Sequence, residues 1–240
     1  MSTCLVWSHR GNVDIDDPQC TPYVNAAGGR APAENSLGAF RLAQSLAIEG
    51  IETDTWLSAD GEFVVVHDRQ APVGLVDRLR RIEVPNLPTL AEVVSAAGRC
   101  RVNVELKMAP EASRELARAT GSELAAKFLS KGAADRVVVS SFSRHATDGV
   151  LAAAPFLKVG HLCEYVPDGE GLRRLASAGY WAIHAWVGSL DGKSVEAVHE
   201  AGLAVVGWTV NDTSVAARLA QLGTEVLITD RPLAVSRACA

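Results

Sequence analysis

Carboxylates and a lysine recur at two-residue spacing in two short strand-like segments. Glu52 and Asp54 stand in "IETD", and Glu105 and Lys107 stand in "VELK". In an extended strand, residues i and i+2 point to the same side, so each pair shares a face. If the two strands are neighbours, the carboxylates converge, and such a cluster repels itself unless a proton or a cation intervenes. Hard oxygen ligands suit Mg²⁺ or Ca²⁺. We therefore predict a divalent metal site formed by Glu52, Asp54 and Glu105.

Two histidines and a second cationic side chain stand at comparable positions. His9 ends "CLVWSH" and Arg10 follows it, while His67 comes at the end of "FVVVHD", whose apolar run predicts a buried strand. Arginine matches phosphate oxygens with its planar fork, and lysine adds a point charge, so Arg10 and Lys107 are candidate phosphate ligands. One imidazole can remove a proton from the nucleophile while the other gives one to the leaving oxygen. This combination indicates phosphoryl chemistry.

Each of these features also has a purely structural interpretation. The pair His67–Asp68 could be a capped turn, the "IETD" carboxylates a solvated edge, and the "VELK" pair a plain salt bridge. All three structural interpretations would have to be true at once, at the ends of strands whose other residues are apolar and suited to burial. We therefore favour a shared site. His184 and Trp186 share a face of a later strand, and we expect both to be buried packing residues.

The elements that must position these residues alternate along the chain. Strand-like segments such as "RVNVELK" and "RVVVSSF" alternate with helical segments, several of which end in glycine, and give eight strand–helix units if 51–68 counts as one strand with an excursion. This alternation is typical of a parallel sheet with crossover helices. It favours a closed (β/α)₈ TIM barrel over a doubly wound open sheet, because neither a linker nor a GxGxxG turn is present. We expect one barrel domain over residues 1–240.

One segment interrupts the alternation. Residues 11–33 show neither helical nor strand periodicity, and loops this long in compact domains are usually functional or disordered. In a barrel the segment follows the first strand, on the side where active sites form. We expect a long loop that covers the barrel mouth and restricts the substrate.

Composition narrows the classes of function. The 240 residues carry a formal net charge of −5, which argues against nucleic acid as a partner. The five cysteines are scattered and form no CxxC pair, which favours reduced thiols in a cytosolic protein. The sequence shows neither a signal peptide nor an apolar run of the roughly 18–20 residues that a membrane span needs. We expect a cytoplasmic protein that acts on a small molecule.

The order of short motifs resembles that of glycerophosphodiester phosphodiesterases. Between His9 and Pro232 the chain contains, in that family's order, "HRG", "ENSLGAF", "IETD", "DGEFVVVHD", "PTLAEV", "VELK", "SSFS", "GWTVND" and "LITDRP". The resemblance implies a (β/α)₈ barrel that hydrolyses glycerophosphodiesters to glycerol phosphate and an alcohol with the help of a divalent cation. Such an activity belongs to lipid and glycerol metabolism.

The resemblance also implies a role for each candidate residue. His9 and His67 would form the acid/base pair. Two assignments rest mainly on the resemblance: Glu34 of "ENS" would support the first-strand site, and Trp208 of "GWTVN" would line the substrate groove. Otherwise Glu34 could be an acid at a helix amino terminus, and Trp208 a core aromatic residue. The other roles agree with those predicted above, with Arg10 and Lys107 for phosphate and Glu52, Asp54 and Glu105 for the metal.

Two of the chain's departures from the family pattern bear on the substrate. Residues 11–33 are longer than usual, and only residues 69–87 separate "HD" from "PTL", which leaves no room for the insertion domain of many members. The departures leave the leaving alcohol and the glycerol moiety open. One alternative is a related barrel phosphodiesterase for lysophospholipids or sugar phosphodiesters. Another is a non-catalytic barrel that binds phosphodiesters, which the intact histidines and carboxylates disfavour.

Overall fold

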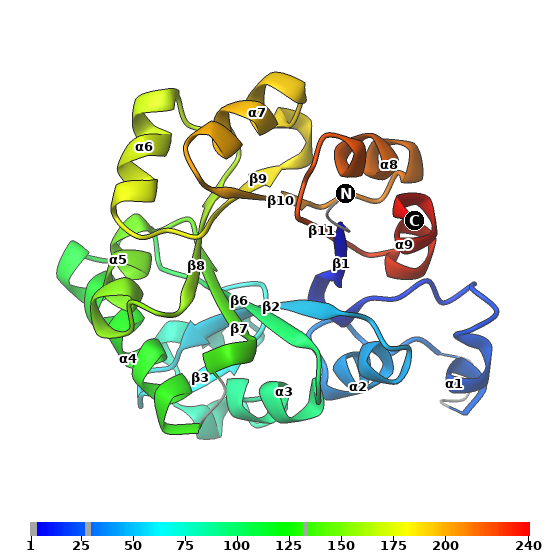
Figure 1. Cartoon of the computed structure of the whole chain (residues 1–240). Helices are drawn as coiled ribbons and strands as arrows, with labels where there is room; N and C mark the ends of the chain where they lie inside the picture. Colours follow the sequence, from blue (N-terminus) through cyan, green and yellow to red (C-terminus); the bar gives the residue numbers. More distant parts are fainter. Residues whose placement is uncertain (1–3, 27–29, 132–133) are drawn as a thin grey trace.

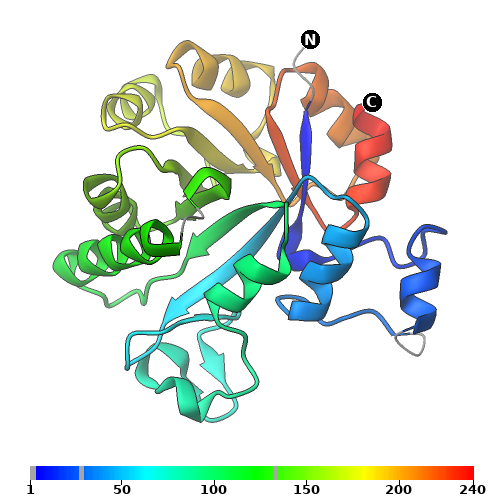
Figure 2. The same cartoon turned by 60° about the horizontal axis from the view of Figure 1, so that its bottom comes forward.

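The computed structural model describes residues 4–26, 30–131 and 134–240. Within them, one sheet has the strand order β1-β11-β10-β9-β8-β7-β6-β2-β3, and β1 also pairs with β2, which closes the barrel. Every pairing around the barrel is parallel, and helices surround it (Figure 1, Figure 2). The predicted (β/α)₈ barrel is confirmed.

The barrel strands are short and mostly buried on both faces, as parallel strands under helices are. They are β1 Leu5–Ser8, β2 Gly50–Leu57, β6 Arg101–Leu106, β7 Val137–Ser141, β8 Lys158–Cys163, β9 Ala182–Trp186, β10 Ala204–Trp208 and β11 Val226–Thr229. In the register of β2 with β6, Asp54 stands opposite Glu105 and Glu52 opposite Asn103. The predicted carboxylates are therefore brought to one place by strand pairing.

The helices α2–α9 form the outer ring. They are α2 Leu37–Ser45, α3 Leu90–Ala96, α4 Arg114–Lys131, α5 Arg144–Ala153, α6 Gly169–Ser177, α7 Gly192–Glu200, α8 Thr213–Gln221 and α9 Pro232–Cys239. Seven of them begin after a side chain that accepts a hydrogen bond from a first-turn N–H, as amino-terminal caps do: Ser36, Thr89, Ser113, Ser143, Asp168, Asp191 and Asp212. Among the helices described, none combines the length and apolarity that a bilayer span requires.

The core has an outer and an inner part. Aliphatic residues such as Val102 and Val104 pack between the strands and the helices, while Trp7 belongs to a second cluster inside the barrel. Gly50 leaves space for this indole, since a Cβ there would clash with the ring of Trp7. Because apolar residues fill the inside at the amino ends of the strands, the buried polar residues of β2 and β6 gather toward the carboxyl ends.

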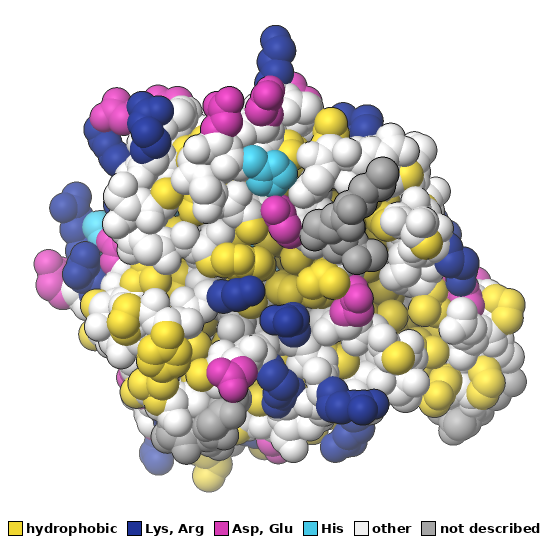
Figure 3. All heavy atoms as spheres, viewed as in Figure 1, with side chains coloured by type: hydrophobic (Ala, Val, Ile, Leu, Met, Phe, Trp, Pro, Cys, Tyr) yellow, Lys and Arg dark blue, Asp and Glu magenta, His cyan; other side chains and the backbone are white. Residues whose placement is uncertain are grey.

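Basic and acidic side chains are interspersed around a hydrophobic centre on the face that Figure 3 shows. The sequence as a whole carries a formal net charge of −5.

The excursion after β2 folds on the side of the barrel. The strand β3 Phe63–Val65 pairs antiparallel with β2, and β4 Gln70–Ala71 and β5 Gly74–Leu75 form a further hairpin that the sequence did not predict. This segment has its own small core, in which Trp56 packs near Val64, Val76 and Val84. Its first residues run back along β2 from Leu57, so that Val66 bonds to Asp54 and His67 follows.

The segment 11–33 differs from what we expected. It contains a short helix, α1 Thr21–Ala26, and its contacts run along α9: Leu233 N donates to Asp14 (2.8 Å), and Arg237 pairs with Asp17 (2.6 Å). Figures 1 and 2 both show α1 outside the ring, beyond α2. The described residues thus lie beside the barrel and do not cover its mouth, because burying Cys20 against the core fixes them there. Residues 27–29 of this segment lie outside the described residues.

Candidate active site

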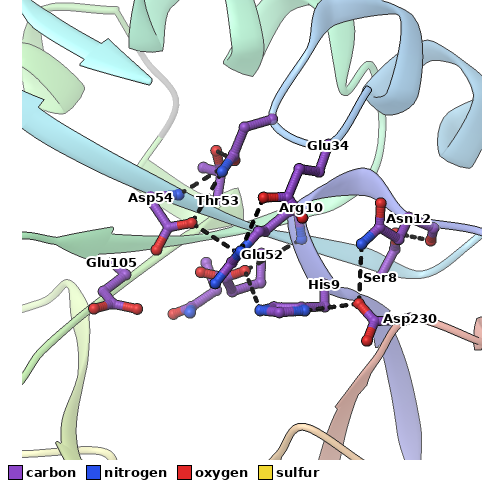
Figure 4. Close-up of polar contacts among 12 residues, drawn as sticks. Ser8, His9, Arg10, Asn12, Glu34, Glu52, Thr53, Asp54, Glu105 and Asp230 are labelled. Carbon is purple, nitrogen blue, oxygen red and sulfur yellow. Dashed lines mark hydrogen bonds and ion pairs between the residues drawn. The ribbon is translucent and has the colours of Figure 1, made fainter. Parts of the chain in front are cut away.

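The predicted metal ligands converge at the carboxyl ends of β2 and β6. One carboxylate oxygen from each of Glu52, Asp54 and Glu105 lies within 4.8 Å of the others. All three side chains are buried, with residue exposures of 4, 1 and 8%. Figure 4 shows them grouped beside His9 and Arg10. The two-residue spacing within β2 and the register with β6 together produce this cluster.

Crowding of buried negative charge shifts the pKa values of these carboxyl groups. Burial, followed by repulsion from Asp54 and Glu105, holds the pKa of Glu52 well above its ordinary value. Burial also raises the pKa of Glu105 to about 7, although Lys107 acts in the opposite direction. At Asp54, Lys107 and a hydrogen bond from Asn35 outweigh burial and lower the pKa. The site thus combines one stable carboxylate with two that resist ionisation.

This donor set fits a divalent cation. A bound double positive charge would relieve the repulsion that raises the pKa values of Glu52 and Glu105. Hard carboxylate oxygens are the donors that Mg²⁺ and Ca²⁺ prefer. A further oxygen, Oδ1 of Asn103, is buried level with Glu52 and has no hydrogen-bond partner within the described part of the chain. Lys107 offsets part of the negative charge of the cluster, since its Nζ lies 3.0 Å from Asp54 and 2.6 Å from Glu105.

Arg10 lies over the same cluster. Its backbone adopts a left-handed conformation with φ of 53°, and its N–H donates to Glu52 at 3.2 Å. Its guanidinium pairs with Asp54 through Nε (3.2 Å) and with Glu34 through Nη1 (2.9 Å). Glu34, with a side chain 48% exposed, therefore reaches the first-strand site through Arg10.

His9 is oriented by an aspartate that the sequence analysis did not assign to the site. Nδ1 of His9 lies 2.7 Å from Asp230, which also accepts hydrogen bonds from Asn12 (2.9 Å) and Asn211 (2.8 Å). These hydrogen bonds outweigh burial and lower the pKa of Asp230, which keeps it an anion. An anion at Nδ1 favours the tautomer with its proton there. The other nitrogen, Nε2, then faces Glu52 at 4.0 Å (Figure 4).

Asn35 is a second residue that the sequence analysis missed. It is buried, with φ of 55°, a conformation that asparagine tolerates better than most residues. Its Nδ2 donates to Asp54 at 3.0 Å, and its Oδ1 accepts from Thr53 at 2.9 Å. A signal existed in "ENS", where a polar residue adjoins Glu34 just before a helix cap.

His67 lies at the same end of β2 but apart from the cluster. Val66 N donates to the carbonyl of Asp54 at 3.2 Å, which places the next residue just beyond the carboxylates. The side chain of His67 is 39% exposed, and its Nδ1 lies 2.7 Å from Asp68. Over the residues described, no hydrogen bond or ion pair joins this imidazole to the carboxylates of Glu52, Asp54 or Glu105.

Trp208 closes the opposite side of the site. It lines a cavity of about 30 Å³ together with His9, Glu52 and Glu105. Its indole N–H donates to the carbonyl of His184 at 2.9 Å, which fixes the ring on this side of the site. His184 is fully buried beneath, as expected, and burial lowers its pKa to about 3. Trp186 is 44% exposed, so the expectation that it is buried was wrong.

Comparisons with known proteins agree with this geometry. The family model "Glycerophosphoryl diester phosphodiesterase family" matches residues 25–234. A glycerophosphodiester phosphodiesterase of Caldanaerobacter subterraneus is 27% identical over 227 residues, which cover 83% of this chain and 89% of that one. A probable glycerophosphodiester phosphodiesterase 2 of Mycobacterium tuberculosis is 29% identical, with 82% of this chain and 81% of that one covered.

Solved structures share the fold. A glycerophosphodiester phosphodiesterase from Parabacteroides distasonis superposes with a TM-score of 0.84 at 20% identity, over 99% of this chain and 97% of that one. An Oleispira antarctica phosphodiesterase, solved with the product sn-glycerol-3-phosphate, gives 0.76 at 23% identity, over 98% and 96%. The match of the family model over most of the sequence decides the assignment. The chain belongs to the glycerophosphoryl diester phosphodiesterase family, and its enzyme class is phosphoric diester hydrolase.

Proposed function

We propose that this protein hydrolyses glycerophosphodiesters to glycerol 3-phosphate and an alcohol. The observation that carries the proposal is the buried cluster of Glu52, Asp54 and Glu105, with carboxylate oxygens within 4.8 Å of one another. The Oleispira phosphodiesterase, of the same fold, binds sn-glycerol-3-phosphate. We further propose that residues 1–240 act as one barrel domain and work in the cytoplasm, which the five free cysteines support.

The proposed cofactor is Mg²⁺ or Ca²⁺, held by Glu52, Asp54 and Glu105. Bound there, the cation would supply positive charge that stabilises the phosphoryl oxygens as negative charge develops. The raised pKa values of Glu52 and Glu105 support this assignment, because both carboxylates need a positive partner to ionise.

His9 and His67 are the proposed proton-transfer pair. The attacking oxygen, from water or from the glycerol 2-hydroxyl, must lose a proton, and the leaving alkoxide must gain one. Support for His9 comes from Asp230, which lies 2.7 Å from Nδ1 and leaves Nε2 free to exchange a proton. For His67 the support is its position just beyond Asp54, with Nδ1 held by Asp68.

Arg10 and Lys107 are the proposed phosphate contacts. Both lie on the carboxylate cluster, and Glu34 holds Arg10 from the solvent side. A phosphate that enters the site would meet two fixed cationic donors, and charge-assisted contacts of this kind orient the diester. Trp208 is the proposed wall of the substrate groove, since it lines the same cavity as His9.

The test measures release of glycerol 3-phosphate from glycerophosphocholine by the full chain. Chelator should abolish turnover, and added Mg²⁺ or Ca²⁺ should restore it. The variant Glu52→Gln/Asp54→Asn should stay folded and inactive, while Glu200→Gln, a change at an exposed glutamate on α7, should keep full activity. Turnover that resists chelation would contradict the metal. Tight binding of the diester without turnover by the metal-loaded protein would indicate the non-catalytic barrel.

A further inference from the structure

The barrel mouth is chemically divided. The ends of β11, β1, β2 and β6 carry the charged residues described above. The ends of β7, β8 and β9 instead carry aromatic side chains that are largely exposed: Phe142 (49%), Tyr165 (72%) and Trp186 (44%). Only two other aromatic residues of the described chain are as exposed, Tyr23 and Phe156. Aromatic residues are few in this protein, at 5%, so three exposed ones at the mouth need an explanation.

A groove beside Phe142 reaches the charged side of the mouth. It has a volume of about 320 Å³, and its lining includes Glu105 and Lys107, the apolar side chains of Met108, Pro110 and Phe142, and the polar side chains of Ser141, Ser143 and His145. Its size lies near the lower limit for small-molecule pockets. The groove therefore borders the carboxylate cluster at Glu105 and offers apolar surface at Met108, Pro110 and Phe142 beside its polar residues.

Phe142 also joins the groove to the centre of the site. Its ring packs edge-on against Trp208, with ring centroids 5.8 Å apart, and Trp208 lines the small cavity beside His9 and Glu52. A substrate whose phosphate lies at the cluster would extend one of its two ester groups along this continuous surface.

The lining favours an uncharged group over a cation. Aromatic faces attract quaternary ammonium groups, but among the residues that the structure describes, Glu105 is the only acidic one that lines the groove. That carboxylate is already paired with Lys107 at 2.6 Å. A cation in the groove would meet the positive charge of Lys107 without a free carboxylate to balance it, whereas an alkyl group would bury apolar surface against Met108 and Phe142.

We propose that the groove binds the leaving alcohol and that the preferred substrates are phosphodiesters whose leaving alcohol carries an apolar group. This inference rests on the proposed function. In the reaction, the attacking oxygen forms a new P–O bond, the P–O bond to the apolar alcohol breaks, and that alcohol departs with one proton gained.

The test uses a series of glycerophospho-n-alkanol diesters from methyl to octyl, with the metal-loaded full chain. Each methylene that the groove buries is worth about a fourfold gain in kcat/KM, so kcat/KM should rise steeply with chain length and level off once the groove is full. Phe142→Ala should flatten this slope, and Phe142→Leu should restore part of it. The matched control is Phe156→Ala, a change at another exposed phenylalanine, which lies before β8 and should leave rate and slope unchanged.

A second comparison separates charge from shape. Glycerophosphocholine and its uncharged isostere, the 3,3-dimethylbutyl diester, differ only in the quaternary centre. The proposal predicts a higher kcat/KM for the uncharged diester. A flat chain-length series, or a clear preference for choline, would overturn it while hydrolysis of the methyl diester still supports the proposed function. Failure to hydrolyse any diester of the series would overturn the proposed function itself.

Discussion

Replacing Glu105 with glutamine should stabilise the metal-free protein at pH 8 and remove its response to a divalent cation. The pKa of Glu105 is about 7 in the folded protein, against an ordinary value of 4.5. A carboxyl whose pKa is raised by folding holds its proton more tightly in the folded state. The folded state therefore loses stability as the pH rises from 4.5 through 7, and nothing is lost below 4.5.

The magnitude follows from the same two values. Each pH unit between them costs the folded state about 1.4 kcal/mol, so ionising Glu105 costs about 3 kcal/mol at pH 8. Glutamine keeps the shape of the neutral acid and never ionises. In the presence of chelator, we expect Glu105→Gln to match the wild type near pH 4.5 and to exceed it by about 3 kcal/mol at pH 8.

Urea denaturation with and without metal measures both effects. A cation at 100 times its Kd should stabilise the wild type by about 2.7 kcal/mol and the variant by much less. Glu200→Gln is the control for the substitution itself and should change stability by less than about 0.5 kcal/mol. A variant no more stable than the wild type at pH 8 would refute the electrostatic argument, and equal stabilisation of both by metal would show that Glu105 is not a ligand.

Four further substitutions test the surroundings of the cluster. His9→Ala and His67→Ala should each lower kcat by about 10²–10⁴ while metal binding persists. A nitrophenyl leaving group should restore activity to whichever variant has lost the general acid. An unchanged kcat for His67→Ala on a natural diester would mean that His67 has only a structural role in its turn. Asp230→Asn should lower kcat more than it changes KM, because the anion at Nδ1 of His9 is gone; a change confined to KM would argue against an orienting role. Asn35→Ala should cost about 1–3 kcal/mol of unfolding free energy in urea, because buried Asp54 loses its amide donor; a smaller loss would mean that water replaces that donor.

Short-range sequence pattern was sufficient to predict the barrel and the carboxylate cluster. The spacing of Glu52 and Asp54 put both on one face, and parallel pairing brought Glu105 level with Asp54. Both facts depend on strand periodicity and on neighbouring strands. For the same reason the predicted strands around "IETD" and "VELK" agree closely with β2 and β6.

Contacts between residues far apart in the sequence, which form only when the barrel closes, could not be predicted from the sequence. His9 and Asp230 are 221 residues apart and meet only because β1 pairs with β11. Asp17 reaches Arg237 across a similar separation, which is why residues 11–33 lie along α9 instead of over the mouth. We expected Trp186 to be buried, because it shares a strand face with His184. Trp186 is the last residue of β9, however, and lies beyond the buried part of that strand.

The central claim is that Glu52, Asp54 and Glu105 hold the divalent cation on which hydrolysis depends. Mn²⁺ shares the preference of Mg²⁺ and Ca²⁺ for carboxylate oxygens, so an anomalous difference map of crystals grown with Mn²⁺ tests the claim directly. We predict a peak among these three side chains, absent in Glu52→Gln/Asp54→Asn crystals. A wild-type enzyme that is active with Mn²⁺ but binds it elsewhere, with this cluster empty, would contradict the account.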